Sequence, residues 1–301
     1  MPADTNMATA DALIALVHDV FGPSPIPLHR PVFEGNERAY LTDTIDSNFV
    51  SSVGPRVIEF EEQIAAFTGA ARAIATVNGT AALRIALLVA GVRAGDEVIS
   101  QALTFVATCN AISYVGAKPV FVDVDADTMG MSPVALREWL EAHTQRVGET
   151  NINRKTGARI AACVPMRTFG YNYRLPNLNA ALGCAQMERL PAMLRIKTDV
   201  AARYRAFCAE YGLHFIDPIP GTTANYWLNA VLSKDRCERD AFLEYTNARG
   251  VMTRPIWRLM NELPAFADCE NNGLETSIWL ADRVVNLRSS VPDAEFHRLK
   301  S

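Results

Sequence analysis

The sequence predicts an α/β protein in which a larger N-terminal domain with a mostly parallel sheet precedes a smaller α+β C-terminal domain. Short β-rich segments alternate with helical patterns in the first half, and a long helical run then leads into mixed strand and helix patterns. Strands that alternate with helices form parallel sheets. The β-rich segments are residues 72–77, 97–101, 119–124 and 159–165. We place the domain boundary near Leu190, which gives domains of residues 1–190 and 191–301.

The elements before the first strand are predicted to be helical. The apolar stretch ALIALVHDVF carries His18 and Asp19 and follows acidic residues, so it predicts an amphipathic helix and not a signal peptide. A Pro-rich joint follows at residues 22–27. Residues 34–67 then predict two helices separated by the small-residue loop 50–54.

The second half of the sequence predicts one long helix and a mixed C-terminal region. Residues 177–212 carry apolar side chains at helical spacing, with Pro191 as a kink or a break. Beyond this helix, DAFLEYTNARG and TSIWLADRVVNL have helical patterns. Together with the segments ANYWLNAVLS and VMTRPIW, they suggest an α+β C-terminal domain.

Composition limits the classes of function. The net charge is −4 and no basic block is present, so nucleic acid is not an expected partner. Six cysteines are scattered without CxxC spacing, which is typical of core residues in a reducing, cytoplasmic compartment. None of the five histidines has a second histidine or a cysteine at ligand spacing, so we expect no metal site. We also expect no membrane partner.

The segment VNGTAALRIALLVAG predicts an anion site. It runs from the end of a strand directly into an amphipathic helix, where the backbone amides of Gly79, Thr80 and Ala81 lack helical partners and can donate to a phosphate. A plain helix cap by an Asn or Thr side chain is the alternative reading. The patterns GxGxxG and GxxxxGK[ST] are missing, which argues against a dinucleotide or a nucleoside triphosphate as the ligand.

The segment QALTFVATCNAISYVGAKPVFVDVD places Phe105 at the carboxyl edge of the predicted sheet, where ligands of α/β folds bind. An aromatic ring at this edge can stack on a flat ligand ring. The alternative reading is an ordinary core phenylalanine.

Seven segments in order carry a resemblance that spans nearly the whole chain. They are IPLHRPVFEGNE, SNFVSSVGPRVIEFEEQIAAFTGA, VNGTAALRIAL, ALTFVATCNAISYVGAKPVFVDVD, NRKTGARIAACVPMRTFG, YNYRLPNLNAALGCAQMERLP and GVMTRPIW. Together they resemble the DegT/DnrJ/StrS sugar aminotransferases, in particular the LegC-type branch. The resemblance implies a fold type I large domain that binds pyridoxal 5′-phosphate (PLP), in a homodimer. It also implies transfer of an amino group from glutamate to the 4-keto group of a UDP-linked deoxy sugar, for the biosynthesis of surface glycans.

The resemblance also assigns site residues. The cofactor phosphate would be held by Gly79, Thr80 and Ala81, and Phe105 would stack on the pyridine ring. Asn172 in YNYRLPN would reach the cofactor of the partner subunit, although a loop with Asn177 as helix cap is the plainer reading of that segment. The sugar-nucleotide site would be lined by Val50, Ser51, Ser52, Arg254 and Trp257.

The family's chemistry has no counterpart in this sequence. Between Gly170 and Tyr171 an internal deletion of about a hundred residues, roughly three βα units, would remove the Schiff-base lysine and the aspartate that faces the pyridine nitrogen. The sheet is therefore expected to be truncated, and no catalytic residue is assigned. The five lysines are all expected to be solvated surface residues; they are Lys118, Lys155, Lys197, Lys234 and Lys300.

Three hypotheses follow. The first is that the chain descends from a sugar aminotransferase and is catalytically inactive. The second is that it is an active transaminase, because the gap is an artefact or because a partner chain completes the site. The third is that it is a non-catalytic assembly subunit that pairs with an intact relative. A dehydrogenase is disfavoured because no glycine fingerprint follows a strand.

Overall fold

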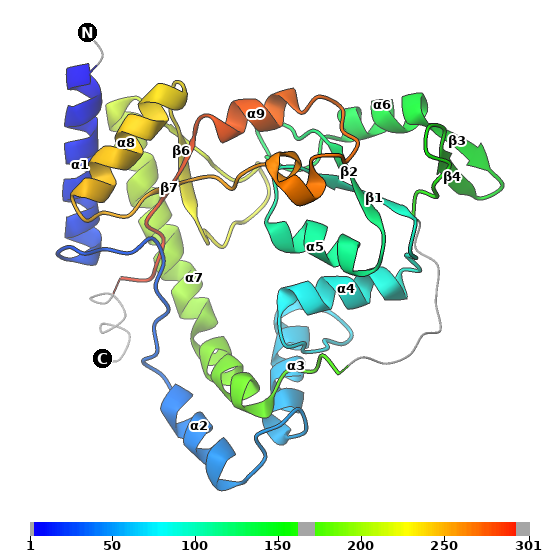
Figure 1. The fold of residues 1–301 in the computed structure, drawn as a ribbon. Coiled ribbons are helices and arrows are strands. Elements are labelled where there is room, and N and C mark those ends of the chain that lie inside the picture. Colours follow the sequence, from blue (N-terminus) through cyan, green and yellow to red (C-terminus); the bar gives the residue numbers. More distant parts are fainter. Residues whose placement is uncertain (1–2, 162–171, 293–301) are drawn as a thin grey trace. The chain divides into compact units, whose positions relative to one another are not determined.

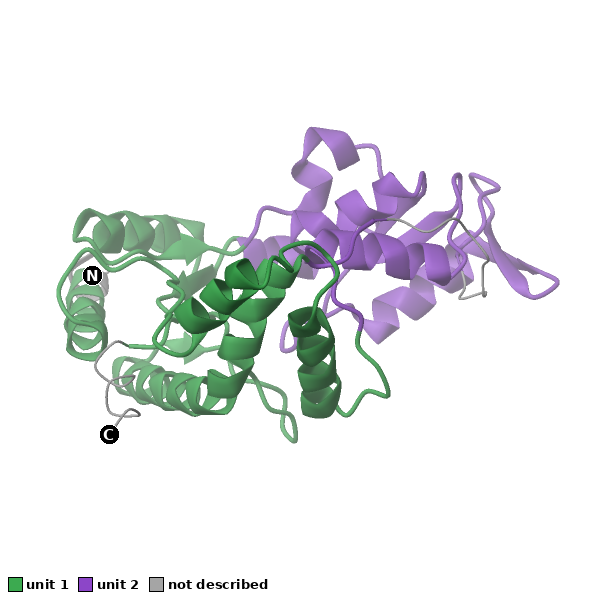
Figure 2. Cartoon of the chain, turned by 90° about the horizontal axis from the view of Figure 1, so that it is seen from below, with its two compact units in different colours: residues 1–73, 176–256, 282–301 green, residues 74–175, 257–281 purple. Residues whose placement is uncertain are grey.

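The structure is a computed structural model, and it describes residues 3–161 and 172–292 (Figure 1). The chain forms two compact units (Figure 2). Unit 1 consists of residues 1–73, 176–256 and 282–301, and unit 2 consists of residues 74–175 and 257–281. The predicted boundary at Leu190 falls inside a continuous helix, and the division into residues 1–190 and 191–301 stays a prediction.

Unit 1 is built on its helices. They are α1 (Ala3–Phe21), α2 (Glu37–Asp46), α3 (Pro55–Thr68), α7 (Asn177–Tyr211) and α8 (Arg236–Ala248). The apolar faces of α1, α7 and α8 pack together in one core, in which Leu13, Tyr204 and Phe242 are buried. The helix α7 continues through Pro191, where the sequence predicted either a kink or a break.

A four-stranded antiparallel sheet completes unit 1, in the order β5-β6-β8-β7. Its strands are β5 (His214–Phe215), β6 (Asn229–Leu232), β7 (Arg254–Pro255) and β8 (Val284–Leu287). The prediction of a helix over the whole of TSIWLADRVVNL is correct only for the first half of this segment. The helix α9 (Glu275–Ala281) ends before the β-branched Val284 and Val285, which are fully buried and pair with the neighbouring strands.

Unit 2 has α/β architecture around a short parallel pair. Strands β1 (Glu97–Gln101) and β2 (Lys118–Val122) are parallel, and α5 (Val106–Tyr114) connects them. The helices α4 (Gly79–Val89) and α6 (Pro133–His143), the hairpin β3 (Thr144–Val147) and β4 (Thr150–Asn153), the 3-10 turns η1 (Met260–Glu262) and η2 (Pro264–Phe266), and α9 complete the unit. The predicted α/β class is therefore confirmed.

Of the two other predicted strands, one is not formed and one is described only in part. Residues 72–77 contribute only an isolated antiparallel bridge between Thr76 and Arg174. In the segment 159–165, Ile160 forms a single parallel bridge to Glu97, and residues 162–165 lie outside the described part of the chain. The described sheet of unit 2 is thus shorter than the sequence predicted.

The helix α4 is unusual for an apolar helix, since none of its side chains is buried. Leu83 and Val89 on this helix and Ile74 and Val77 just before it are exposed, with Ile74 79% accessible. Apolar helices in α/β units normally cover a sheet. Within the described residues, α4 does not bury its apolar side chains against a sheet in this way.

Candidate functional site

The N-terminus of α4 is the first candidate for a binding site. Asn78 caps the helix in an extended conformation, and its Oδ1 accepts from the Ala81 amide at 2.9 Å. Of the three amides predicted to hold a phosphate, Ala81 therefore already has a partner. The amides of Gly79 and Thr80 have no helical acceptor because they lie in the first turn. The helix cap by an Asn side chain is thus observed, and two of the three predicted amides stay without a helical acceptor, so the phosphate site stays a prediction.

The space around these donors is open. A Cβ added at Gly79 would meet no heavy atom within 4 Å. The positive end of the helix macrodipole points to the same place. The start of α4 is therefore open on the side of the Gly79 Cβ position.

Phe105 caps the start of α5, immediately after the carboxyl end of β1. Its ring is 55% accessible, so the core reading of this residue is wrong. The indole ring of Trp257 lies edge-on to it, with the ring centroids 6.1 Å apart and an interplanar angle of 60°. The structure therefore brings together two predicted site residues that are far apart in the sequence.

The segment that contains Asn172 lies beside the strand-like residues that lead into α4. The Val77 amide donates to the Tyr173 carbonyl at 2.8 Å, and the Leu175 amide donates to the Ala75 carbonyl at 3.2 Å. Asn172 itself is exposed. Its predicted contact with a cofactor in a partner subunit stays a prediction.

The loop with Val50, Ser51 and Ser52 connects α2 and α3 in unit 1. The Ser51 carbonyl accepts from the Asn177 amide at 2.6 Å, while the Val50 side chain is exposed. The cap of α7 is Pro176, so the prediction that Asn177 caps this helix was wrong. The Asn177 side chain instead accepts from the Val57 amide at 3.1 Å in the first turn of α3.

Arg254, the other predicted sugar-nucleotide residue of unit 1, is exposed in β7. Its backbone pairs with Asn286 of β8, and its guanidinium lies 3.9 Å from the Met252 Sδ. Among the described residues, no hydrogen bond or ion pair joins Arg254 to the loop 50–52. The assignment of the predicted sugar-nucleotide residues therefore stays a prediction.

No lysine of unit 2 lies at the carboxyl end of its sheet. Lys118 pairs with Glu97 at the first register position of the two strands, whereas Phe105 follows their last position. The first and last positions of these strands are four residue steps apart, which is about 13 Å. Lys155 lies at the Lys118 end, since both line the same pocket. The described lysines of unit 2 are thus on the wrong edge to meet a ring held at Phe105.

That pocket was not predicted from the sequence. It has a volume of about 570 Å³ and contains a buried polar network. The Asn153 Nδ2 donates to Glu97 at 2.7 Å and to Glu270 at 3.0 Å, and the Thr156 hydroxyl donates to Glu97 at 2.7 Å. The carboxylate of Glu97 is therefore satisfied by protein donors, which favours a structural role.

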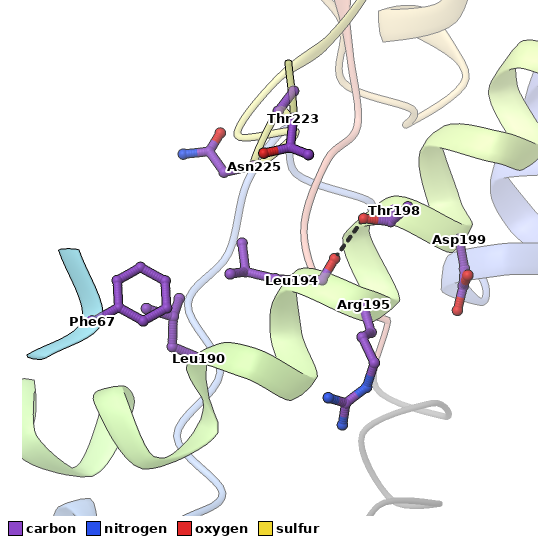
Figure 3. Close-up of a pocket in the computed structure, with 9 residues that line it drawn as sticks. Phe67, Leu190, Leu194, Arg195, Thr198, Asp199, Thr223 and Asn225 are labelled. Atoms are coloured by element: carbon purple, nitrogen blue, oxygen red, sulfur yellow. Dashed lines mark hydrogen bonds between the residues drawn. The ribbon is translucent and has the colours of Figure 1, made fainter. Parts of the chain in front are cut away.

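A second pocket, of about 640 Å³, lies within unit 1 (Figure 3). Its walls come from Phe67 near the end of α3, from α7 and from the loop 223–225. The α7 residues that line it are Leu190, Leu194, Arg195, Thr198 and Asp199. None of the predicted site residues is among its lining residues.

Two further findings concern metals and membranes. In residues 3–161 and 172–292, no three His, Cys, Asp or Glu side chains gather so that they could hold a metal ion. No helix in the same ranges is both long and apolar enough to cross a bilayer.

The parallel pair β1–β2 and the helices around it define a class, namely an α/β protein with two amide donors at the start of a helix. A sequence model of the DegT/DnrJ/EryC1/StrS aminotransferase family matches residues 31–153 and 147–293. The chain therefore belongs to this family, as the seven sequence segments predicted.

Two relatives and one solved structure illustrate the similarity. GDP-perosamine synthase from Vibrio cholerae is 26% identical over 343 residues, which cover 88% of this chain and 94% of that protein. UDP-4-amino-4-deoxy-L-arabinose–oxoglutarate aminotransferase from Shewanella sediminis is 43% identical over 113 residues, or 38% of this chain and 29% of the relative. The fold is shared with NtdA from Bacillus subtilis, solved with its cofactor pyridoxamine phosphate (PMP), at a TM-score of 0.70 and 19% identity over 94% of this chain and 87% of that one.

Members of this family bind PLP or PMP, so the fit of the cofactor to this chain can be tested. The phosphate end fits, because Gly79 and Thr80 offer two amides in open space. The reactive end does not fit, because the lysines of unit 2 lie at the opposite edge of the sheet. Within unit 2, the described residues therefore offer two amide donors for a phosphate, and no lysine of this unit lies beside Phe105 to meet the aldehyde.

Proposed function

We propose that this chain is a nucleotide-sugar aminotransferase homologue that retains a non-covalent phosphate site for PLP or PMP and does not carry out transamination by itself. The observation that carries the proposal is the geometry of unit 2: two amide donors at the start of α4 have no helical acceptor, and Lys118 and Lys155 lie at the end of the sheet away from Phe105. Transamination of a keto sugar needs an amine over the cofactor ring to move the proton.

An internal deletion between Gly170 and Tyr171 explains the missing amine. The alignment with the Vibrio cholerae synthase runs over 343 positions, whereas 88% of 301 residues is about 265, so about 80 positions of that relative have no counterpart here. The family model also matches this chain in two stretches rather than one. Both observations support the loss of a continuous internal segment.

The exposed surface of unit 2 supports the same interpretation. A parallel sheet is normally buried on both faces, and its helices bury an apolar stripe against it. Here the sheet has a described parallel pair only, and no side chain of α4 is buried. These exposed apolar groups are what the removal of neighbouring strands would leave behind.

Within the retained site, residues of this chain bind the phosphate group and orient the flat ring of a ligand. The Gly79 and Thr80 amides and the Thr80 hydroxyl donate to the phosphate oxygens, while the Asn78 side chain holds the helix start in place. Phe105, braced by the edge of Trp257, offers one ring face to a flat ligand. When bound in an intact relative, the cofactor supplies the electron sink for amino transfer.

The ancestral substrate is inferred to be a UDP-linked 4-keto deoxy sugar with glutamate as the amino donor. The LegC-type motifs support this choice, and so does the local 43% identity to an aminotransferase whose name contains a UDP-linked amino sugar. We further propose that Val50, Ser51, Ser52, Arg254 and Trp257 derive from the sugar-nucleotide site. In a homodimer, Asn172 would complete the neighbouring cofactor site.

Two measurements test the proposal. In the first, purified chain is incubated with PLP, glutamate and a UDP- or GDP-linked 4-keto-6-deoxy sugar. No amino sugar should be detected by mass spectrometry. Formation of an amino sugar by the chain alone would overturn the proposal that the chain does not carry out transamination by itself. Calorimetry with PMP then tests the phosphate site, because PMP has no aldehyde and forms no imine with any lysine.

The site predicts which variants weaken PMP binding. Thr80→Val removes one donor and should weaken binding by about three- to tenfold, which corresponds to the ~1 kcal/mol of one hydrogen bond. Ser113→Ala is the matched control, because Ser113 is exposed at the far end of α5. Absence of PMP binding, or equal binding by both variants, would reject the phosphate site.

A second candidate function is assembly with an intact member of the family. The observation that favours it is the uncovered apolar surface of Ile74, Val77 and Val89, which a partner with complete strands could cover. Co-expression with a tagged intact relative should yield a co-purifying complex. Ile74→Glu should abolish the complex. The control Ile219→Glu, at an exposed position of unit 1, should not abolish it. Recovery of the unaltered chain without the intact relative would reject this candidate function.

A further inference from the structure

Lys197 is not the solvated surface residue that the sequence predicted. It lies in the middle of α7, beside Ile196, which is buried against Val32 and Val291. The Lys197 side chain is half-buried, and its ammonium group donates to the backbone carbonyl of Ser289. The sequence did contain a signal for this position. Lys197 precedes the fully buried Ala201 by four residues, so it lies on the buried face of the helix.

The surroundings of the Lys197 amine are cationic. Arg288, one residue before Ser289, is only 5% accessible and donates to the Pro27 carbonyl. Its guanidinium lies over the Phe21 ring, 5.0 Å from the centroid. Among the described residues, no carboxylate forms an ion pair with Lys197. Burial beside a permanent positive charge disfavours the protonated form of the amine.

The pKa values of this cluster agree with its geometry. Burial, with a smaller contribution from Arg288, lowers the pKa of Lys197 to about 8. Burial and then the charges of Lys197 and Arg288 also lower the pKa of His29. At pH 7.5 about a quarter of the Lys197 amines are therefore neutral, against about one in a thousand for an ordinary lysine.

We propose that Lys197 is a reactive amine site that captures small anionic aldehydes as an imine. The neutral amine attacks the carbonyl carbon, so a C–N bond forms, and the carbonyl oxygen leaves as water with the two protons of the amine. The positive charge of Arg288 attracts an anionic group on the same molecule. The Ser289 carbonyl orients the amine before attack. This site belongs to unit 1, and it does not depend on the proposed function of unit 2.

The proposal is tested on the full chain, with pyridoxal 5′-phosphate as the anionic aldehyde and pyridoxal as its uncharged counterpart. Sodium borohydride reduces the imines, and peptide mapping by mass spectrometry measures the labelled fraction of each lysine. At pH 7.5, Lys197 should be labelled about tenfold faster than Lys118, Lys155 and Lys234, because the gain in neutral amine exceeds the loss of nucleophilicity that accompanies a lower pKa. The phosphate ester should label Lys197 at least threefold faster than pyridoxal, and 0.5 M salt should reduce this preference.

Two further measurements separate a reactive site from a merely accessible amine. The rate of labelling of Lys197 against pH in the unaltered protein should have its midpoint near 8. Arg288→Gln should move this midpoint upward, while Lys197→Arg should remove the label and leave the far-ultraviolet circular dichroism unchanged. If Arg288→Gln fails to fold, the pH profile of the unaltered protein decides.

The proposal is overturned by equal labelling of the four described lysines, by protection of Lys197, or by a midpoint near that of an ordinary lysine. Equal rates with pyridoxal and its phosphate would remove the anionic part of the proposal and thereby reject it as stated. Amino-sugar formation, the readout for unit 2, is a separate measurement, so the two proposals can fail independently.

Discussion

The carboxylate of Asp123 accepts both the hydroxyl proton and the amide proton of Ser277, at 2.6 and 2.9 Å. Asp123 follows β2, and Ser277 lies in the first turn of α9, more than 150 residues further along the chain. The Asp123 side chain also accepts from the Thr276 amide at 2.8 Å. One buried carboxylate therefore joins the strand to the start of the helix within unit 2.

We expect Asp123→Asn to lower the free energy of unfolding by about 1–3 kcal/mol, because an amide presents one acceptor where the carboxylate presents two. Burial alone would raise the pKa of Asp123, but the hydrogen bonds to its carboxylate outweigh burial, and the pKa is lowered. The stabilisation should thus be complete above about pH 4 and be lost as the pH falls through the folded-state pKa. Urea unfolding at pH 7 and pH 3 measures both effects.

Asp127→Asn is the control for this prediction, since Asp127 is exposed in the same loop. It should change the stability at pH 7 by less than about 0.5 kcal/mol. Equal losses for the two variants, or a difference that does not shrink in acid, would contradict the role assigned to Asp123.

The local part of the fold could be predicted from the sequence, because periodicity and turn residues are local signals. Strand β1 has the predicted bounds of Glu97–Gln101, and two helices flank the loop at residues 50–54 as expected. The end of α9 was missed because helical spacing in TSIWLADRVVNL continues past Ala281. Only pairing of Val284 and Val285 with distant strands makes that segment extended.

The candidate site could be predicted only where its residues are close in sequence. The helix start at Gly79 and the aromatic at Phe105 follow from local patterns, but the contact between Phe105 and Trp257 joins segments that only the fold brings together. The burial of Lys197 beside Arg288 depends on the same kind of long-range packing. A lysine on a helix is by default a surface residue, and only the position of the neighbouring segments reverses that expectation.

Gly54 should not tolerate a side chain. An alanine Cβ at this position would lie 2.3 Å from the Asn177 Cγ, and the Asn177 amide group cannot move away because it donates to the Phe49 carbonyl at 2.6 Å. Gly54→Ala should therefore cost about 2 kcal/mol, measured by urea unfolding. Gly79→Ala is the matched control, since nothing lies within 4 Å of its Cβ position.

A double variant checks that the clash is the cause. Asn177→Ser also destabilises the protein, but it shortens the side chain that Gly54→Ala strikes. The loss in the double variant should be smaller than the sum of the two single losses by at least about 1 kcal/mol. Strict additivity would show that Gly54 is required for another reason.

Of the five described cysteines, Cys237 should react alone with iodoacetamide in the native protein, because it is exposed and the other four are buried. Burial raises the pKa of Cys109 and of Cys184 to about 12, so their thiols hold almost no thiolate at pH 7.5. Mass spectrometry should show labelling of these two at least about 100-fold slower than that of Cys237. In Cys237→Ser the described cysteines should stay unlabelled until urea is added; rapid native labelling of Cys109 would contradict the burial of α5.

Removal of the Lys197 charge should stabilise the protein at neutral pH. The pKa of Lys197 falls from 10.5 to about 8 on folding, mainly through burial, so folding at pH 7 carries a cost that we put at about 1–3 kcal/mol for this half-buried group. Lys197→Met keeps the stem of the side chain and removes the charge, although it also loses the hydrogen bond to Ser289. We expect a net gain of about 1 kcal/mol at pH 7 in urea unfolding.

The pH dependence separates this effect from better packing. Between pH 8 and 10.5 the unfolded chain binds more protons at Lys197 than the folded chain, so the stability of the unaltered protein should rise through this window and the advantage of Lys197→Met should vanish. The Lys197 charge is one cause of the lowered pKa of His29, so Lys197→Met also relieves that shift and adds to the advantage of the variant at lower pH. Lys234→Met, at a lysine in the loop before α8, is the control and should change stability by less than about 0.5 kcal/mol at either pH. An advantage for Lys197→Met that persists at pH 10.5 would mean that packing, and not the buried charge, limits the stability of α7.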